Sequence, residues 1–295
     1  MYQKKAAIFL YCVSPVHMGA GSAIGVVDNP IQREAHTGHP SFAGSGIKGA
    51  VRHGFELLAG EGARDKAEAI FGSNTRAGAA SFGDAQLVLF PVRSTRHGYV
   101  YATSSQALAR AARLLALLGL ELDWRVPDVA EGQALLGEQG KAELAGGGKL
   151  DLEFFQYTAQ ASAAVEAVAS WLADKALPTD GGYGYFRDKI RRHMVVLSDT
   201  DFSYFVQNAT LVEPHVRINE ETVTADEGGL FYTENLPPES LLIAPLFASA
   251  ERGSEGMTAE QVMGHLRTAL DKKAMQLGGD ATTGRGLVVM TLVEG

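Results

Sequence analysis

The chain has 295 residues, of which 46% are hydrophobic and 20% charged, and this composition is typical of a globular protein with a large core. Its formal net charge of −8 argues against non-specific binding of nucleic acid over the whole surface, so an RNA site would have to be local. The single cysteine, Cys12, excludes a disulfide within the chain. No apolar run reaches the roughly 18 residues of a membrane span and no secretory signal is present, which predicts a cytoplasmic protein without membrane contact.

Apolar periodicity predicts alternating strands and helices in the first half of the chain. Residues 5–13 form an apolar run typical of a buried strand, and residues 14–40 form a long loop rich in Gly, Pro, His and Asp. A loop of this length is uncommon in a compact domain unless it carries a function. The further elements predicted here are a helix at 45–59, strands at 81–92 and 99–103, and a helix at 104–118.

The second half contains a weakly periodic segment, a hairpin and a capped helix. Residues 120–150 end in three glycines and favour an insertion. Residues 212–219 alternate, and after a polar turn the chain returns through 222–232, which predicts a β-hairpin with few core residues. An arm that projects from the body and an ordinary edge hairpin are the two alternatives. Thr258 and Gln261 predict a capping box at the start of a helix. The further predicted elements are strands at 150–158, 193–197, 241–247 and 286–293 and a helix at 162–176.

The order of these elements predicts the fold class. A strand, a helix and a strand are followed, after intervening segments, by a second strand, helix and strand. Two such split βαβ units form one sheet, so we expect an α+β fold. The predicted architecture is a modified RRM-like (ferredoxin-like) sheet, the palm, with helical insertions and a projecting hairpin.

A glycine-rich turn leads directly into a helix in Ser41–Arg52. Apolar residues at helical spacing face the core, so Lys48 and Arg52, four residues apart, lie on the other side. Ser45 is predicted as the N-cap, and the glycines let an anion approach the helix N-terminus. A second glycine-rich stretch at 277–288 strengthens the prediction of a phosphate-binding surface. The turn is not a P-loop, and a capped helix with solvated Lys and Arg is the alternative.

Several stretches of the sequence resemble a known family. They are Leu10–Gly21 with Gly25–Gly38, the turn and helix at Gly44–Arg52, and the loop Gly278–Gly286. Together they are similar to the backbone subunit of the Cmr (type III-B) CRISPR effector complex, in the RAMP superfamily, and the similarity extends over nearly the whole chain. Its specific part is Asp28–Glu34, because glycine-rich loops occur throughout the RAMP proteins.

The resemblance implies a single RAMP domain over 1–295, with an insertion at about 120–150 and a thumb hairpin at about 208–236. Copies of the chain would stack into a filament along a CRISPR guide RNA, together with other Cmr complex subunits. Each thumb would displace one nucleotide of the guide–target duplex, and the target RNA would be cut beside it. The implied activity is an endoribonuclease that requires a divalent cation, Mg²⁺ or Mn²⁺, and works by attack of the ribose 2′-OH.

The family's catalytic aspartate matches Asp28. A displaced nucleotide frees its 2′-OH to align with the adjacent phosphate, and one carboxylate eases deprotonation directly or by holding the cation. The alternative for Asp28 is a turn aspartate before Asn29 and Pro30. His36 and His39 lack the spacing of a metal site and have no matching carboxylate.

The other candidate residues fall into two groups. Residues expected to contact the RNA are His17, Arg33, Ser45, Lys48, Arg52, Gly284 and Arg285. His36, Tyr232 and Glu234 are expected to assist, the last two by reaching a neighbouring copy. The family tends to carry two consecutive acidic residues where this chain has Thr233 and Glu234.

Two other functions compete with the nuclease. In the first, the chain is a non-catalytic RNA-binding scaffold of the same complex, and cleavage belongs to other subunits. In the second, it is a stand-alone RAMP endonuclease that trims precursor guide RNA with a histidine base and without metal, so a chelator would separate it from the first hypothesis.

Overall fold

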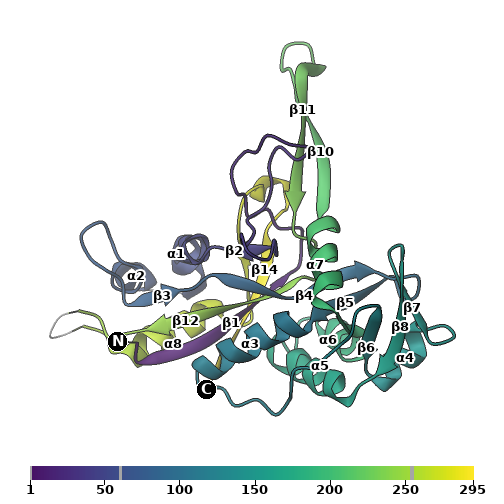
Figure 1. The fold of residues 1–295 in the computed structure, drawn as a ribbon. Coiled ribbons are helices and arrows are strands. Elements are labelled where there is room, and N and C mark those ends of the chain that lie inside the picture. Colours follow the sequence, from purple (N-terminus) through teal and green to yellow (C-terminus); the bar gives the residue numbers. More distant parts are fainter. Residues whose placement is uncertain (1, 60–61, 253–255) are drawn as a thin grey trace.

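The computed structural model describes residues 2–59, 62–252 and 256–295. Its centre is a sheet in which four strands follow the order β14-β1-β12-β4 (Figure 1). Each neighbouring pair is antiparallel. The four strands are β1 (Lys4–Cys12), β4 (Ala85–Arg93), β12 (Leu241–Ala248) and β14 (Leu287–Glu294).

Two helices join these strands in pairs. Helix α1 (Gly44–Ala59) lies between β1 and β4 in the chain, and α8 (Ala259–Leu270) lies between β12 and β14. This order, with β12 next to β1, is that of two split βαβ units. The predicted α+β fold is therefore confirmed, and the strand order is consistent with the predicted ferredoxin-like palm.

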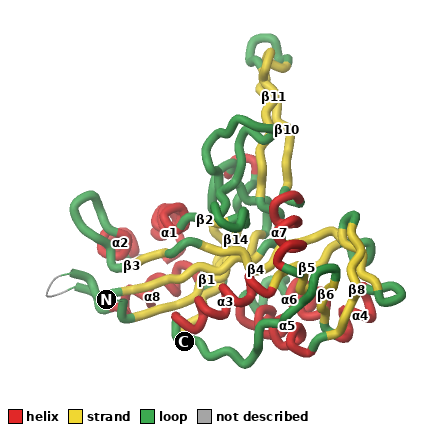
Figure 2. The backbone as a smooth tube through the Cα atoms, in the orientation of Figure 1, coloured by secondary structure: helices red, strands yellow, loops and turns green. Residues whose placement is uncertain are grey.

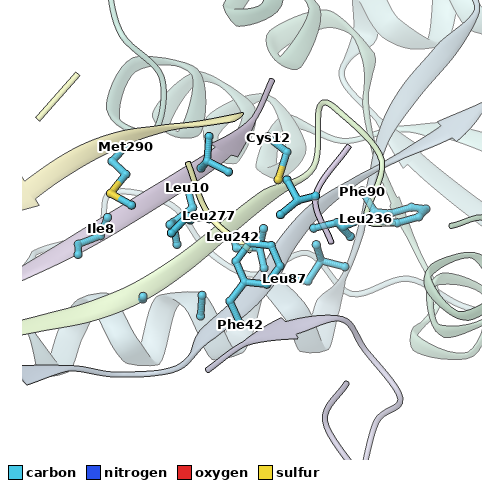
Figure 3. Close-up of a cluster of buried hydrophobic side chains, with 14 of the residues drawn as sticks. Ile8, Leu10, Cys12, Phe42, Leu87, Phe90, Leu236, Leu242, Leu277 and Met290 are labelled. Atoms are coloured by element: carbon cyan, nitrogen blue, oxygen red, sulfur yellow. The ribbon is translucent and has the colours of Figure 1, made fainter. Parts of the chain in front are cut away.

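Both faces of the palm are buried. Strand β1 is exposed only at its first two residues, which explains why its sequence is apolar without alternation. Ile8 and Leu10 pack in the core layer that includes residues of α1 and α8, and Figure 3 shows them beside Leu242 and Met290. Phe9 points into the opposite layer, formed with α3 (Ser105–Leu117) and α5 (Ala163–Lys175). The palm therefore offers no open sheet face to a ligand.

The sheet continues beyond β4 into strands formed by residues 99–197. Its order there is β4-β5-β9-β6-β8-β7, with β5 parallel to β9 and β6 parallel to β8. Residues 120–150, expected as a weakly periodic insertion, contain a strand and a helix and begin a third element. The elements of this part are β5 (Tyr99–Ser104), β6 (Gln133–Leu136), α4 (Glu138–Leu144), β7 (Lys149–Leu152), β8 (Phe155–Ala161), α6 (Gly184–His193) and β9 (Met194–Leu197).

Two predicted strands are each broken in the structure. The strand at 81–92 divides at Gly83 and Asp84, where the chain turns from β3 (Ala80–Phe82) into β4. The strand at 150–158 is the hairpin of β7 and β8, and Glu153 at its turn has a positive φ of 49°. The remaining elements are β2 (Ser41–Phe42), α2 (Ala63–Phe71), α7 (Asp199–Asn208), β13 (Lys273–Gln276) and η1 (Ala281–Thr283).

The predicted hairpin is present and projects from the body. Strands β10 (Leu211–Ile218) and β11 (Ala225–Asn235) form a separate two-stranded sheet, here called the thumb, which stands clear of the palm (Figures 1 and 2). Helix α7 leads into it. Only the last residues of β11 are buried continuously, so the palm holds the thumb at its root.

Helix α8 begins as predicted. The Thr258 hydroxyl accepts from the Gln261 N–H, and the Gln261 side chain accepts from the Thr258 N–H. This reciprocal pair is a capping box and confirms the prediction. Within the described residues no helix has both the length and the apolar character needed to cross a membrane.

Candidate functional site at the root of the thumb

The long loop at 14–40 is tied to the root of β11 at two places. Val16 and Leu236 exchange two backbone hydrogen bonds of 2.9 Å. Further along the loop, Asn29 forms a parallel bridge with Thr233, and the Glu234 N–H donates to the Asn29 carbonyl at 3.0 Å. The loop at 14–40 therefore runs beside the thumb root and is bound to it at both places.

Asp28 is held at this junction by three hydrogen bonds to one residue. The N–H groups of Asp28 and Asn29 both donate to the Tyr232 carbonyl, at 3.1 and 3.0 Å. The Tyr232 N–H in turn donates to Asp28 Oδ2 at 2.7 Å. The other oxygen, Oδ1, accepts no hydrogen bond from the described residues. Asp28 is half-buried, so one oxygen fixes the side chain and the other is available for chemistry.

His17 is anchored two residues further along β11. Its Nδ1 lies 2.7 Å from the Glu234 carbonyl oxygen, which only accepts, so Nδ1 is the donor and Nε2 is the ring nitrogen left for another partner. A Cβ at position 19 would lie 2.9 Å from that Nε2, so Gly19 leaves room for it. Because successive strand residues rise by about 3.3 Å, the anchors of His17 and Asp28 lie about 7 Å apart.

The carboxylate of Glu234 is occupied within its own chain. Its Oε1 pairs with the Arg33 guanidinium and accepts from the Thr210 hydroxyl at 2.7 Å, and its Oε2 accepts from the Ile31 N–H at 3.0 Å. The side chain is only 7% exposed. Glu234 therefore ties the Asp28 loop to the thumb, whereas the sequence had suggested that it reaches a neighbouring copy.

Arg33 was expected to contact RNA, and its guanidinium is also engaged internally. Besides the pair with Glu234, its Nη1 donates to the carbonyls of Gly38 and Val206, at 2.7 and 2.9 Å. These partners come from the loop and from α7. Arg33 thus joins the loop to the helix that leads into the thumb.

Glu34 connects the same loop to α3. Arg110 binds it through both terminal nitrogens, at 2.7 and 2.5 Å, and the Thr37 hydroxyl donates to it at 2.7 Å. Burial raises the pKa of Glu34, but these hydrogen bonds outweigh burial and hold the pKa below its ordinary value. His36, expected to assist in catalysis, is 73% exposed, and its nearest charged partner is Glu34 at 3.8 Å.

The C-terminal glycine-rich loop packs against His17. The Gly279 N–H donates to the His17 carbonyl at 2.9 Å, and a Cβ at Gly278 would lie 2.3 Å from that oxygen. Gly278 also has a positive φ of 84°, so only glycine suits this contact. Arg285 pairs with Glu213 of β10 at 2.6 Å, and Gly284, at φ 79°, is exposed. The loop therefore braces the thumb through its first strand, β10.

The start of α1 differs from the prediction. The helix begins at Gly44, so Ser45 lies within its first turn and is not the N-cap. The Gly44 N–H donates to Asp84 Oδ1 at 2.7 Å, and a Cβ there would lie 2.3 Å from the Phe82 carbonyl oxygen. An internal carboxylate thus already occupies the positive end of the helix. The broken strand at Gly83 and Asp84 is what places that carboxylate.

The two basic residues of α1 lie outside the thumb root. Arg52 is exposed, and Lys48 is half-buried near Arg76 and Arg252, which sequence reasoning did not connect with it. The structure therefore gathers His17, Asp28, Tyr232, Glu234 and Arg285 around the thumb root. It leaves His36 and Arg52 at the surface.

The thumb itself is acidic and carries an exposed apolar face. Residues 211–235 contain six carboxylates and one guanidinium. Val216 pairs across the strands with Leu230, and both are about half exposed, at 47% and 55%. Val212 continues the same face of β10 at 44% exposure. A ligand that contacts this face of the thumb therefore packs against apolar side chains.

One group of side chains in the described part of the chain has the spacing of a metal site. His97, Glu143 and His193 present ligand atoms within 4.8 Å of one another. The ammonium of Lys189 lies 3.2 Å from His193 Nδ1, and Arg192 pairs with Glu143 at 3.4 Å. These two cations oppose a metal ion there, and Asp28 is not part of the group.

Comparisons with known proteins agree on one family. The family model described as the RAMP superfamily matches residues 9–289. The CRISPR system Cmr endoribonuclease Cmr4 of Pyrococcus furiosus is 33% identical over 99% of this chain and 96% of its own length. The CRISPR system CMR subunit Cmr4 of Saccharolobus solfataricus is 24% identical over 95% and 94%.

Solved structures are similar over the whole chain. The crystal structure of oligomeric Cmr4 from Pyrococcus furiosus has a TM-score of 0.74 at 27% identity, over 99% of this chain and 98% of that one. A chain of the type III-B Cmr-beta complex bound to cognate target RNA, studied by cryo-EM, has a TM-score of 0.72 at 19% identity, over 99% and 98%. This second likeness shows the fold alone.

Proposed function

This chain belongs to the RAMP superfamily and, within it, to the Cmr4 proteins, and on that premise we propose that it is the backbone subunit of a type III-B CRISPR effector and an endoribonuclease. Copies of the chain bind a guide RNA side by side, within a complex with other Cmr subunits, and cleave the target RNA that pairs with the guide. A cytoplasmic location, where both RNAs meet, is part of the proposal.

The observation that carries the nuclease assignment is the fixed carboxylate of Asp28 beside the thumb. Its Oδ2 is bound by the Tyr232 N–H at 2.7 Å, while Oδ1 has no donor among the described residues. A pre-positioned base with one unused oxygen costs little reorganisation when substrate binds. The projecting thumb supplies the means to displace a nucleotide beside it.

In the proposed reaction the ribose 2′ oxygen attacks the adjacent phosphorus while Asp28 accepts its proton. The bond from phosphorus to the 5′ oxygen breaks, and that oxygen takes up a proton. The products are a 2′,3′-cyclic phosphate and a strand with a 5′-OH, so no co-reactant is consumed. A regular duplex forbids the in-line geometry, which a displaced nucleotide allows.

The divalent cation is part of the proposal, and the donor set at Asp28 fits it only together with RNA. Asp28 supplies one carboxylate and belongs to no group of three ligand-type side chains among the described residues. Mg²⁺ is commonly held by one or two carboxylates together with substrate phosphates and waters. When bound, the cation would offset charge that develops on the phosphate.

Guide RNA is held through side chains more than through the start of α1. Asp84 already binds the Gly44 N–H, which weakens the attraction of that helix end for phosphate. Lys48 and Arg52 remain as cations on α1. Such contacts read the backbone and leave sequence recognition to base pairing.

The variant Asp28→Asn tests the assignment. Asn keeps an oxygen for the Tyr232 N–H but loses the charge that accepts a proton, so we expect cleavage of target RNA to slow by at least about 100-fold. Cleavage is measured with the guide-loaded complex and a labelled target. Binding of guide and target should stay within about twofold of wild type, because no RNA-binding cation changes.

The matched control is Asp180→Asn, which removes the same charge from an exposed position on the loop before α6. It should cleave as the wild type does. Unchanged cleavage by Asp28→Asn would contradict the nuclease assignment and support the non-catalytic scaffold. Cleavage by the isolated protein in the presence of a chelator would instead support the stand-alone endonuclease with a histidine base.

A further inference from the structure

A cavity of about 480 Å³ is lined by residues next to α2 and β3. Figure 1 shows that these two elements lie at the end of the palm away from the thumb. The walls of the cavity come from Tyr2, from the turn between α2 and β3, and from the segment after β12. Lys48 of α1 closes one side. No residue of the thumb or of the loop at 14–40 lines it, so it is separate from the site around Asp28.

The lining of this cavity is cationic. Lys48, Arg76 and Arg252 all contribute to it, and none of the lining residues that the structure describes is Asp or Glu. Arg76 is held by Glu251 at 2.7 Å, while Lys48 and Arg252 form no ion pair with a described carboxylate. On a chain with a net charge of −8, such a concentration of cations attracts anions locally and repels metal ions.

The size of the cavity and its remaining polar groups restrict the class of ligand that it can bind. The cavity falls within the range of about 300–1,000 Å³ typical of small-molecule sites, larger than a phosphate ion requires. Hydroxyl groups of Tyr2 and Ser81, 2.9 Å apart, stand at its wall with Ser73. Three cations with hydroxyl donors, and no carboxylate among the described lining residues, suit a phosphorylated ligand of nucleotide size.

We propose that this cavity binds a nucleotide of an RNA strand through its phosphate, as a second contact beyond the thumb root. The proposal rests on the proposed function, because Lys48 belongs both to the cavity and to the α1 surface assigned to guide RNA. Arg76 and Arg252 line the same cavity as Lys48, so a strand bound by Lys48 is within reach of both. The cavity thereby extends the length of RNA held by each copy of the chain.

Two variants of the full chain test the cavity. Arg252→Gln removes an exposed cation, and Ala250→Trp fills the exposed mouth of the cavity without changing charge. Binding of a labelled single-stranded RNA of about 12 nucleotides is measured by fluorescence anisotropy over a range of salt. We expect both variants to bind about 3- to 10-fold more weakly and Arg252→Gln to lower the salt slope by about 0.7, the value for one phosphate contact.

The control Arg125→Gln removes the same charge from an exposed position outside the cavity and should bind as the wild type does. Equal binding by Arg252→Gln and wild type would overturn the proposal. Displacement of the RNA by equimolar AMP would identify a free nucleotide as the ligand, and displacement by an oligoglutamate peptide would identify an acidic protein. Either result would overturn the assignment to an RNA strand.

Target cleavage by the wild-type guide-loaded complex is measured in parallel. If the wild type cleaves and Arg252→Gln binds RNA normally, the cavity proposal fails while the proposed function stands. If the wild type does not cleave, the proposed function fails, whatever the cavity binds.

Discussion

Glu234 shows how a single buried carboxylate positions a site without taking part in its chemistry. Its carboxylate pairs with the guanidinium of Arg33 and accepts from the Ile31 N–H, both from the Asp28 loop. It also accepts from the Thr210 hydroxyl, in the segment before the thumb. Each bond joins two segments that are distant in sequence. We therefore assign Glu234 as a positioning residue for Asp28.

The variant Glu234→Gln should destabilise the protein and also slow cleavage. Removing one partner of a buried ion pair leaves the other charge unpaired, a change worth about 3–5 kcal/mol, and the partial exposure of Arg33 lowers the expected loss to about 2–3 kcal/mol. Urea unfolding measures the loss of stability, and the cleavage assay measures the effect on Asp28. The control Glu220→Gln, on the exposed thumb turn, should change neither.

The sequence predicted several residues of the site correctly, but it did not predict which residues they contact. Asp28 and His17 lie at the thumb root in the long loop, whose length had signalled a function. Arg33 and Glu234 were expected to face RNA or another copy, and they bind each other. The sequence does not show that two residues 201 positions apart are in contact. Because both side chains are charged, they were predicted to be exposed and to bind a partner.

At the scale of elements, α8 is the helix whose start the sequence specified most directly. Thr258 and Gln261 satisfy two backbone N–H groups that would otherwise lack partners. The inner face of the helix, which includes Val262 and Leu266, is fully buried against the palm. Local capping and core packing therefore agree along this helix.

Replacing Thr258 with Ala removes one half of the capping box. We expect the free energy of unfolding to fall by about 1 kcal/mol, within the range of roughly 0.5–2 kcal/mol for N-cap threonines. Thr268→Ala is the matched control, because its hydroxyl donates to the Gly264 carbonyl inside the same helix and caps nothing. A loss as large in the control would contradict the role of the cap.

The helices α6 and α7 were both missed by sequence reasoning, for different reasons. The buried residues of α6 are Lys189, Ile190 and His193, so its sequence lacks an apolar stripe. Helix α7 had a usable signal, since Ser198 caps it by accepting from the Asp201 N–H. The breaks in two strands depend on turns at Gly83 and Glu153, which short apolar runs do not reveal.

At the scale of the whole molecule, Glu239 lies where the thumb returns to the palm. Its N–H donates to the Cys12 carbonyl at 2.7 Å, at the end of β1, and its φ is 70°. The carboxyl group accepts from the Tyr101 hydroxyl at 3.2 Å. Burial raises the pKa of Glu239 from 4.5 to about 7.

This raised pKa makes the stability of the fold depend on pH. The folded state holds the Glu239 proton more tightly than the unfolded state does, so the contribution is fully present below about pH 4.5 and is lost as pH rises to about 7. Glu239→Gln, which cannot ionise, should therefore be more stable than wild type at pH 8, on the order of 1 kcal/mol for a half-buried group, and similar at pH 4.

Thermal unfolding at both pH values measures the difference. The control Glu227→Gln removes a carboxylate from the exposed part of the thumb and should show no such dependence on pH. A constant gap between Glu239→Gln and wild type from pH 4 to pH 8 would contradict the role given to the buried carboxyl group.

The sign of the thumb's charge has a consequence for how RNA is gripped. Glu213 and Glu234 are paired with arginines, but the other four carboxylates of the thumb repel phosphates, while the cations of α1 attract them, and dissolved ions screen both effects. In the proposed mechanism, raising the ionic strength therefore weakens the repulsion between the thumb and the duplex, and it also weakens the attraction between the palm and the RNA. Because these two effects of salt oppose each other, we expect the affinity for a guide–target duplex to be highest at an intermediate ionic strength.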